Sequence, residues 1–224
     1  MAHFEIEVKS LLGEAARAAA LKKKMLELDP DCACISQNKQ LNHYFAGGDI
    51  QELYQNAAPL LSPEQQEKLR TVCMQGGNCS VRTRQRDDEV LLVVKAAIDK
   101  GTSENTVQRM EFEEPMPLSL AELDALVEAA AYSYQAKWSR EREEYAYKGI
   151  TVCLDCNAGY GYVAEFEKIV AEATEADAVR SELEALMVEL EVEELAQERL
   201  ARMFEFYNQN WQEYYGTTKV FVIE

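Results

Sequence analysis

Several segments of this chain alternate strictly between apolar and charged residues, and no other feature restricts the possible fold as much. Residues 4–9, for example, read FEIEVK. Successive side chains of a β-strand point to opposite faces, so this segment is predicted to be a strand with one apolar and one charged face. Four later segments repeat the pattern, and these residues share a charged face within each: Arg82 and Arg84; Arg109, Glu111 and Glu113; Arg140 and Arg142; Glu165 and Glu167. The alternate positions, which include Val8, Val81, Phe112 and Phe166, are expected to pack a core.

The charged faces group like charges, which a merely solvated sheet face does not explain. A solvent-exposed face is the usual explanation for one such strand, but here five strands carry grouped carboxylates or grouped guanidinium groups. Like charges held close cost free energy unless a ligand neutralises them. Grouped carboxylates suit a hard divalent cation such as Mg²⁺ or Mn²⁺. Grouped Arg and Lys side chains suit phosphate groups, so the pattern indicates a metal–polyphosphate site.

The remaining segments predict helices between strands, and therefore an α+β fold. We expect helices at 14–28, 50–75, 119–130, 178–190 and 193–212, the second restarting at Ser62-Pro63 and the third beginning with a Ser119–Glu122 capping box. Further strands are expected at 33–45, 80–84, 90–97, 106–113, 136–147, 150–156 and 162–170, with a last strand at 217–223. This order favours an antiparallel sheet, curled or closed, with helices outside. The absence of a long linker predicts a single domain over residues 1–224.

Composition excludes several classes of partner. The 224 residues include 40 Asp and Glu against 23 Lys and Arg, which gives a net charge of −17. So acidic a chain is expected to bind neither nucleic acid nor a membrane. The amino terminus lacks the pattern of a secretory signal, so a cytoplasmic protein is expected, with its six cysteines as free thiols. Cys153 and Cys156 do not suggest zinc, because residues three apart on a strand point to opposite faces.

The motifs, taken in order, are similar to those of one family. Residues 5–9 match E-x-E-x-K, and residues 40–45 (QLNHYF) resemble Q-x-D/N-x-Y-F. Arg82-Thr83-Arg84 resembles R-x-R, residues 140–145 (REREEY) resemble K-x-R-x-x-Y with Arg in place of Lys, and residues 161–167 (GYVAEFE) resemble G-x-x-x-E-x-E. Lys95, residues 109–113, Asp155 and Lys219 fit the same scheme. The chain thus resembles the CYTH superfamily, the triphosphate tunnel metalloenzymes.

This resemblance implies an eight-stranded, closed antiparallel β-barrel that binds a triphosphate-containing small molecule and Mg²⁺ or Mn²⁺ inside. The implied metal ligands are Glu5, Glu7, Glu111, Glu113, Asp155, Glu165 and Glu167. The implied substrate-binding residues are Lys9, Arg82, Arg84, Lys95, Arg109, Arg140, Arg142 and Lys219. The implied catalytic residues are Glu5, Glu7, Lys9, Glu165 and Glu167. A helical insert at 49–77 is long for a compact member and is a candidate cover for one tunnel mouth, and helices at 177–214 precede the last strand.

Two reactions fit such a site, and no residue decides between them. One is metal-dependent hydrolysis of inorganic, nucleoside or thiamine triphosphate, which we prefer. The other is the class IV adenylyl cyclase reaction, which converts ATP to cyclic AMP and pyrophosphate. A non-catalytic phosphate sensor is disfavoured, because binding phosphate does not require six carboxylates.

Three side issues remain open at the level of sequence. Trp138 shares a face with Arg140 and Arg142, so its ring either stacks on an organic substrate group or packs against a helix, and packing is the favoured interpretation. His43 is out of phase with its charged and polar neighbours, which indicates a packing or surface role. The apolar stripes of the last two helices fit a monomer or a homodimer.

Overall fold

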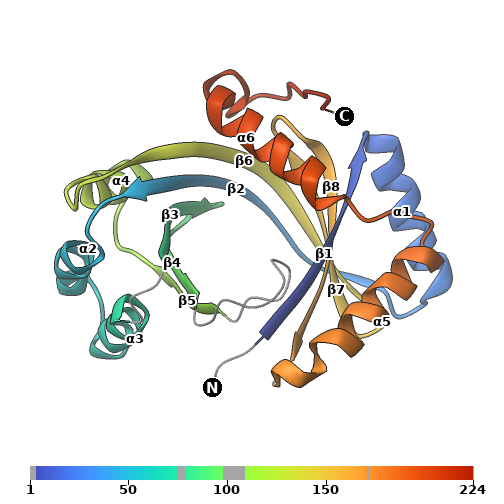
Figure 1. Ribbon diagram of the computed structural model, residues 1–224, viewed down its shortest axis with the longest axis horizontal. Coiled ribbons are helices and arrows are strands. Elements are labelled where there is room, and N and C mark those ends of the chain that lie inside the picture. Colours follow the sequence, from blue (N-terminus) through green and yellow to red (C-terminus); the bar gives the residue numbers. More distant parts are fainter. Residues whose placement is uncertain (1–3, 75–78, 98–108, 171, 224) are drawn as a thin grey trace.

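The computed structural model describes residues 4–74, 79–97, 109–170 and 172–223. Its strands are β1 (Phe4–Gly13), β2 (Ala33–Gly47), β3 (Cys79–Arg86), β4 (Glu89–Ala97), β5 (Arg109–Pro115), β6 (Tyr132–Tyr147), β7 (Ile150–Asn157) and β8 (Gly161–Val170). Its helices are α1 (Ala15–Leu28), α2 (Ile50–Ala57), α3 (Pro63–Met74), α4 (Leu120–Glu128), α5 (Ala176–Glu189) and α6 (Gln197–Tyr214), with 3₁₀ turns at Ala58–Leu60 and Ala173–Glu175. The α+β prediction is confirmed (Figure 1).

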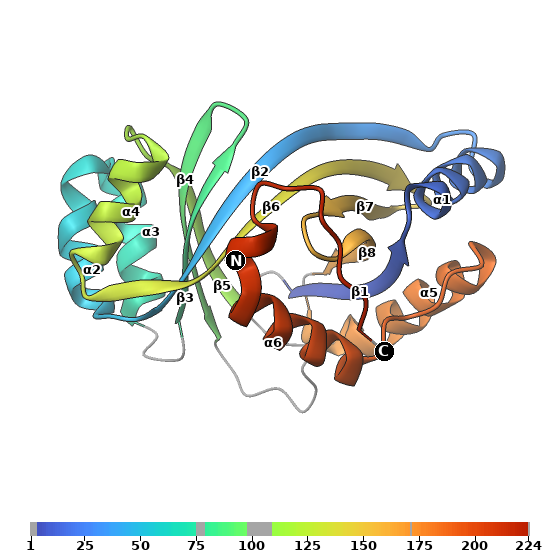
Figure 2. The same cartoon turned by 90° about the horizontal axis from the view of Figure 1, so that it is seen from above.

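The strands form one antiparallel sheet in the order β1-β8-β7-β6-β2-β3-β4-β5. The sheet curls strongly, with the long strands β2 and β6 paired across its middle (Figures 1 and 2). Its end strands are β1 and β5, and no pairing between these two is found within the described ranges. The antiparallel sheet of eight strands is therefore confirmed, whereas the predicted closure into a barrel is not.

One outer layer covers the β1 side of the sheet. Helices α1 and α5 pack against the apolar face of β1, β8 and β7. Both helices lie outside these strands in Figure 1. Val8 and Phe166 are 2% and 0% exposed, as the alternation predicted. Met25 and Leu183, from the two helices, are buried in the same cluster.

A second outer layer covers the other half of the sheet. Helices α2, α3 and α4 pack on β3, β4 and β5, where Val81 and Phe112 are both fully buried. The insert therefore packs on the outer face through Leu53 and Leu69. Its suggested role as a cover for a tunnel mouth stays a prediction. The capping box predicted for the third helix is present, since Ser119 and Glu122 bond reciprocally at the start of α4.

Helix α6 packs on the opposite, inner face of the sheet. Leu11, Trp138 and Val163 lie on that face, in phase with the charged residues, and they form a third apolar cluster with α6. The Trp138 ring stacks on Tyr207 with 3.7 Å between ring centroids. The packing interpretation of Trp138 is therefore confirmed, and α6 covers one end of the inner face.

The last strand predicted at 217–223 is wrong. Residues after α6 run past the β7–β8 turn without forming a strand and make one parallel bridge, between Gly159 and Val220. The reason is aromatic packing: Phe221 lies against Tyr160 and Phe206, at centroid distances of 5.3 and 4.8 Å. Gly159 has φ +85°, and a Cβ there would lie 2.7 Å from the Tyr207 ring, so this close approach requires glycine.

None of the helices in the described part of the chain combines the length and the apolar character needed to cross a membrane.

Candidate functional site

The inner face of the sheet carries a continuous field of charged and polar side chains. Cross-strand pairs such as Asn42–Arg84, Gln40–Arg140 and Lys9–Glu165 fix this shared face. Across the sheet, the side chains are Glu7 and Lys9 on β1, Glu165 and Glu167 on β8, Asp155 on β7, Arg140 and Arg142 on β6, Gln40, Asn42 and Tyr44 on β2, Arg82 and Arg84 on β3, Lys95 on β4, and Glu111 and Glu113 on β5. Apart from Lys9 on the end strand β1, the cations occupy the middle of the sheet, and carboxylates lie on both sides of them.

Glu165 is the centre of the ion pairs on the β1 side. Its Oε1 accepts a hydrogen bond from Lys9 Nζ at 2.6 Å, and its Oε2 accepts one from Arg142. Lys9 Nζ also lies 2.6 Å from Glu7 Oε1. Burial alone would raise the pKa of Glu165, but Lys9 and Arg142 lower that pKa well below its usual value. Glu165 is therefore ionised, and its position is fixed by two cations.

Asp155 holds two arginine side chains in place. It is 1% exposed, and its Oδ2 accepts from Arg140 Nη1 and Arg142 Nη2, each at 2.7 Å. Arg142 Nε donates to Oδ1, also at 2.7 Å, which completes a bidentate pair. Burial opposes the charge of Arg142, but Asp155 and Glu165 raise its pKa. Both carboxylate oxygens of Asp155 are thus engaged in orienting guanidinium groups.

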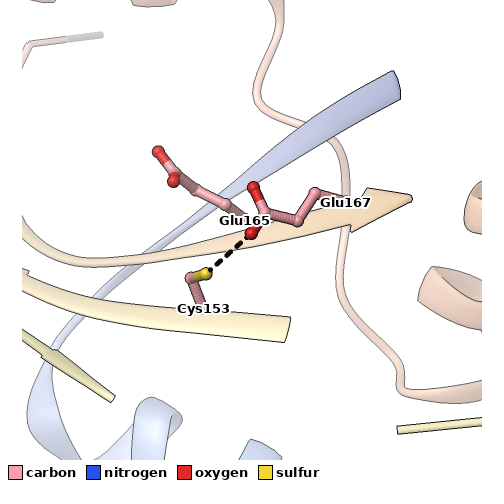
Figure 3. A group of neighbouring side chains, drawn as sticks. All are labelled: Cys153, Glu165 and Glu167. Atoms are coloured by element: carbon pink, nitrogen blue, oxygen red, sulfur yellow. Dashed lines mark hydrogen bonds between the residues drawn. The ribbon is translucent and has the colours of Figure 1, made fainter. Parts of the chain in front are cut away.

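One group of side chains has the spacing that a metal ion requires. Ligand atoms of Cys153, Glu165 and Glu167 all lie within 4.8 Å of one another (Figure 3). The Cys153 thiol donates to Glu167 Oε1 at 3.2 Å. Burial raises the pKa of Cys153, so the sulfur remains a neutral donor and the carboxylate oxygens are the ligands that a hard cation would use. The two carboxylates of this group therefore offer oxygen ligands for a hard divalent cation.

The middle of the sheet concentrates positive charge around Tyr44. Arg82 Nη1 donates to Tyr44 Oη at 3.1 Å, and its guanidinium carbon lies 4.7 Å from the centre of that ring. Burial alone would raise the pKa of Tyr44, but Arg82, Arg140, Arg84 and Lys95 lower it. Burial, with repulsion from Arg82 and Arg140, also lowers the pKa of Arg84, although Glu113 opposes this. These shifts indicate a strongly positive local potential, despite the acidic chain.

Arg82 has an unsatisfied donor at the centre of this field. Its Nε is buried and has no hydrogen-bond partner among the described residues. Arg84, in contrast, donates from Nε to Asn42 Oδ1 at 2.7 Å and from Nη1 to Glu113 Oε1 at 2.8 Å. A buried guanidinium donor without an acceptor is costly, and an anionic oxygen would satisfy it.

The β5 carboxylates belong to a separate part of the face. Glu111 pairs with Lys95 at 3.0 Å, and Glu113 pairs with Arg84. Neither takes part in the Cys153–Glu165–Glu167 group. They lie on the far side of the cations, so the predicted metal set is divided between two sides of the sheet.

A buried polar network lies directly behind these cations, on the outer face. Asp124 of α4 accepts from Thr83 Oγ1 at 2.5 Å and from Tyr134 Oη at 2.8 Å, and its Oδ2 lies 2.7 Å from His43 Nδ1. His43 Nε2 lies 2.7 Å from Tyr215 Oη. His43 is 4% exposed, so of the two roles predicted for it, packing or surface, the structure shows packing.

The structure brings most of the predicted site residues onto one face, with three exceptions. Lys219 is exposed and belongs to the C-terminal segment outside the sheet. The side chains of Glu5 and Arg109 lie outside the described part of the chain, although their backbones belong to β1 and β5. Sequence reasoning missed Cys153 and the charge field around Tyr44. Cys153 is two residues before Asp155 on the same strand. Strand alternation could therefore have placed Cys153 on the inner face.

Solved structures share this fold. Two proteins from Pyrococcus horikoshii OT3 match at TM-scores of 0.58 and 0.59, with 17% and 18% identity; the matches cover 84% and 90% of this chain, and 91% and 98% of the other chains. A candidate adenylate cyclase from Vibrio parahaemolyticus is 16% identical, with a TM-score of 0.59, and the match covers 92% of this chain and 99% of that one. At such identities the likeness concerns the fold alone. No curated protein matches the sequence.

A family model identifies the chain more directly. The CYTH domain model matches residues 77–200, which is more than half of the sequence. The matched range includes Arg82, Arg84, Arg142, Glu165 and Glu167, and thus most of the cations and carboxylates described above. This chain therefore belongs to the CYTH family.

Proposed function

We propose that this protein is a divalent-metal-dependent hydrolase of triphosphate compounds. The observation that carries the proposal is the buried group of cations around Tyr44, in which Arg82 Nε has no acceptor within the described structure. Several guanidinium groups at one place match a chain of phosphate groups, because each binds phosphate oxygens bidentately. In this proposal the curled sheet surrounds the triphosphate as a tunnel, with β1 and β5 as its two sides.

The carboxylates on the β1 side provide the metal site of the proposal. Glu7 and Glu167, with Glu5, would hold Mg²⁺ or Mn²⁺, together with Glu165 once it exchanges its contact to Lys9 or Arg142 for the ion. When bound, the ion neutralises charge on the transferred phosphoryl group. Asp155 orients Arg140 and Arg142 toward the phosphates, and we assign it this positioning role in place of the metal-ligand role implied by the motif. Arg82, Arg84 and Lys95 bind the remaining phosphate oxygens.

Hydrolysis then needs only a positioned water molecule. A carboxylate of the β8 pair accepts a proton as water attacks the terminal phosphorus. The bond from phosphorus to the bridging oxygen breaks, and diphosphate leaves while the central arginines stabilise its charge.

Cyclisation of ATP to cyclic AMP and pyrophosphate is the second candidate. The Vibrio parahaemolyticus protein that shares the fold is named as a candidate adenylate cyclase. Both reactions would use the same carboxylates and cations, so the products distinguish them.

Product analysis tests the proposal. Purified protein is incubated with Mg²⁺ or Mn²⁺ and either ATP or inorganic triphosphate, and orthophosphate, pyrophosphate and cyclic AMP are measured. We expect orthophosphate release, reduced about a hundredfold or more in Glu165→Gln, the scale of losing one transition-state contact. Glu64→Gln, on the outer helix α3, is the matched control and should keep full activity. Cyclic AMP with pyrophosphate would favour the cyclase, and no product with either metal would overturn both candidates.

A further inference from the structure

The end of helix α6 reaches the buried polar network behind the central cations. Tyr215 directly follows α6, and its Oη lies 2.7 Å from His43 Nε2. His43 Nδ1 lies 2.7 Å from Asp124 Oδ2, and Asp124 Oδ1 accepts a hydrogen bond from Thr83 Oγ1 at 2.5 Å. These four side chains, which we call the Tyr215–Thr83 network, therefore connect the C-terminal helix to strand β3.

The interior of this network is closed to solvent. Thr83, His43 and Asp124 are 0%, 4% and 5% exposed. Burial alone would raise the pKa of Asp124, but its hydrogen bonds with His43, Thr83 and Tyr134 lower that pKa. A buried carboxylate is costly, and apolar side chains of similar volume often stabilise such a position equally well. The network therefore suits a role in fixing the geometry of the strands.

The central residues of the network lie directly behind the cation site. His43 of β2 and Thr83 of β3 are paired across the two strands. On the inner face, two further pairs flank them, which are Asn42 with Arg84 and Tyr44 with Arg82. Each of these pairs is joined by a hydrogen bond, of 2.7 and 3.1 Å respectively. A shift of the His43–Thr83 pair would therefore move both arginines together with their partners.

The central cations need such support because they repel one another. Burial lowers the pKa of Arg84, and repulsion from Arg82 and Arg140 lowers it further. Like charges held close cost free energy, so contacts elsewhere must hold β2 and β3 in register. The Tyr215–Thr83 network supplies these contacts from the opposite face of the sheet.

We propose that Tyr215 is a positioning residue for phosphate binding, which acts through the Tyr215–Thr83 network on Arg82 and Arg84. The inference rests on the proposed function, in which these two arginines bind phosphate oxygens. Helix α6 also packs on the inner face through Tyr207, so this one helix and the residue after it contact both faces of the sheet. Docking of the C-terminal helix is therefore coupled to phosphate binding.

Affinity for inorganic triphosphate tests the inference. The Kd is measured by calorimetry without divalent metal, at a temperature where every variant is folded, and the KM is measured with Mg²⁺. Tyr215→Phe breaks the network at its outer end, and Thr83→Val breaks it at its inner end. We expect each variant to raise the Kd and the KM about fivefold, the usual net contribution of one hydrogen bond. Thr83→Ser keeps the hydroxyl and should keep the wild-type values.

Tyr207→Phe is the matched control, because it removes a hydrogen bond of the same helix that lies outside the network. Tyr207 Oη donates to Lys137 O at 2.9 Å. This variant should melt below wild type and keep the wild-type Kd. Equal weakening in Tyr207→Phe and Tyr215→Phe would mean that any loosening of α6 lowers the affinity, which would overturn the specific role of Tyr215.

A double variant tests whether the two ends of the network act together. Changes at independent sites have additive effects on free energy, whereas changes within one hydrogen-bond network do not. Tyr215→Phe combined with Thr83→Val should therefore raise the Kd about fivefold, as each single change does, and not about twenty-five-fold. Wild-type affinity in both single variants, or a loss of about twenty-five-fold in the double variant, would overturn the inference.

Failure of the proposed function gives a different result. If the wild type binds triphosphate without releasing product, and the Kd still depends on Tyr215, the positioning role stands and the hydrolase is contradicted. If product is released and neither single variant changes the Kd or the KM, the hydrolase stands and the positioning role is contradicted. Absence of both binding and turnover in the wild type contradicts both.

Discussion

Some residues of this site contribute both to the stability of the fold and to the proposed reaction, and Glu165 is the clearest example. Its side chain is 12% exposed and bonded to Lys9 and Arg142. Removing one partner of a buried ion pair leaves uncompensated charge, so Glu165→Gln should lower the free energy of unfolding by about 3 kcal/mol at neutral pH.

The pH dependence of this loss follows from the direction of the pKa shift. The folded pKa of Glu165 lies below its usual value of 4.5. The ion pair therefore stabilises the protein fully above that value, and its contribution declines as the pH falls toward the folded pKa. Urea unfolding at neutral pH and at about pH 3 should show the difference between wild type and Glu165→Gln shrinking in acid. A difference that stays constant would mean that the carboxylate charge does not contribute, and Glu64→Gln should show no difference at either pH.

Residue types and their phase were largely predictable from sequence, but their partners were not. Alternation correctly identified Val81 and Phe112 as core, because strand geometry imposes a period of two. The engagement of Asp155 with two arginines was not predictable, because cross-strand register is not encoded in a single segment. Trp138 was placed on the correct face, yet its covering by α6 depends on a helix far along the chain.

At the scale of elements, α4 anchors the strands that carry the central cations. Asp124 bonds to Thr83 on β3, to Tyr134 on β6 and to His43 on β2. Thr83 lies between Arg82 and Arg84, so the carboxylate of one helix holds three strands in register directly behind the site.

Two acidic residues of this helix allow a direct comparison. Asp124→Ala leaves several buried donors unsatisfied, so it should lower the free energy of unfolding by about 3 kcal/mol. Glu122→Ala removes half of an exposed capping box and should cost about 1 kcal/mol or less. Urea denaturation of both variants measures the two losses. Equal losses would contradict the anchoring role of Asp124.

The order of elements was predictable from sequence, whereas their final arrangement was not. Ser119 with Glu122 and Ser62 with Pro63 marked helix starts correctly, because these signals act within one turn. The segment 217–223 has strand composition, yet it makes only one bridge, between Gly159 and Val220. Its Phe221 packs in the aromatic cluster instead, and only the tertiary structure determines that choice.

At the scale of the whole molecule, the inner face of the sheet is positively charged although the chain as a whole is acidic. The chain carries a net charge of −17, yet its inner face gathers Arg82, Arg84, Arg140 and Lys95 around one tyrosine. Sequence could predict that the cations share a face. It could not predict that the carboxylates divide to both sides of them, because the strand order is not the chain order.

This arrangement predicts that Arg82 contributes little to the stability of the free protein but strongly to the binding of triphosphate. Without substrate, Arg82 repels its cationic neighbours and its Nε lacks an acceptor in the described structure. Arg82→Met should therefore leave the free energy of unfolding within about 1 kcal/mol of wild type, or raise it. Triphosphate at about a hundred times its Kd should stabilise the wild type by about 2.7 kcal/mol, and the variant by much less.

Thermal melts with and without inorganic triphosphate distinguish a binding role of Arg82 from a structural role. Arg70→Met, on the outer face of α3 in an exposed pair with Glu67, is the matched arginine control and should keep the full ligand-induced shift. If Arg82→Met melted well below wild type and kept that shift, Arg82 would be a structural residue. Loss of the ligand-induced shift, with the stability of the free protein unchanged, would mean that the fold holds Arg82 in place despite repulsion from its cationic neighbours. An anion would then complete the site.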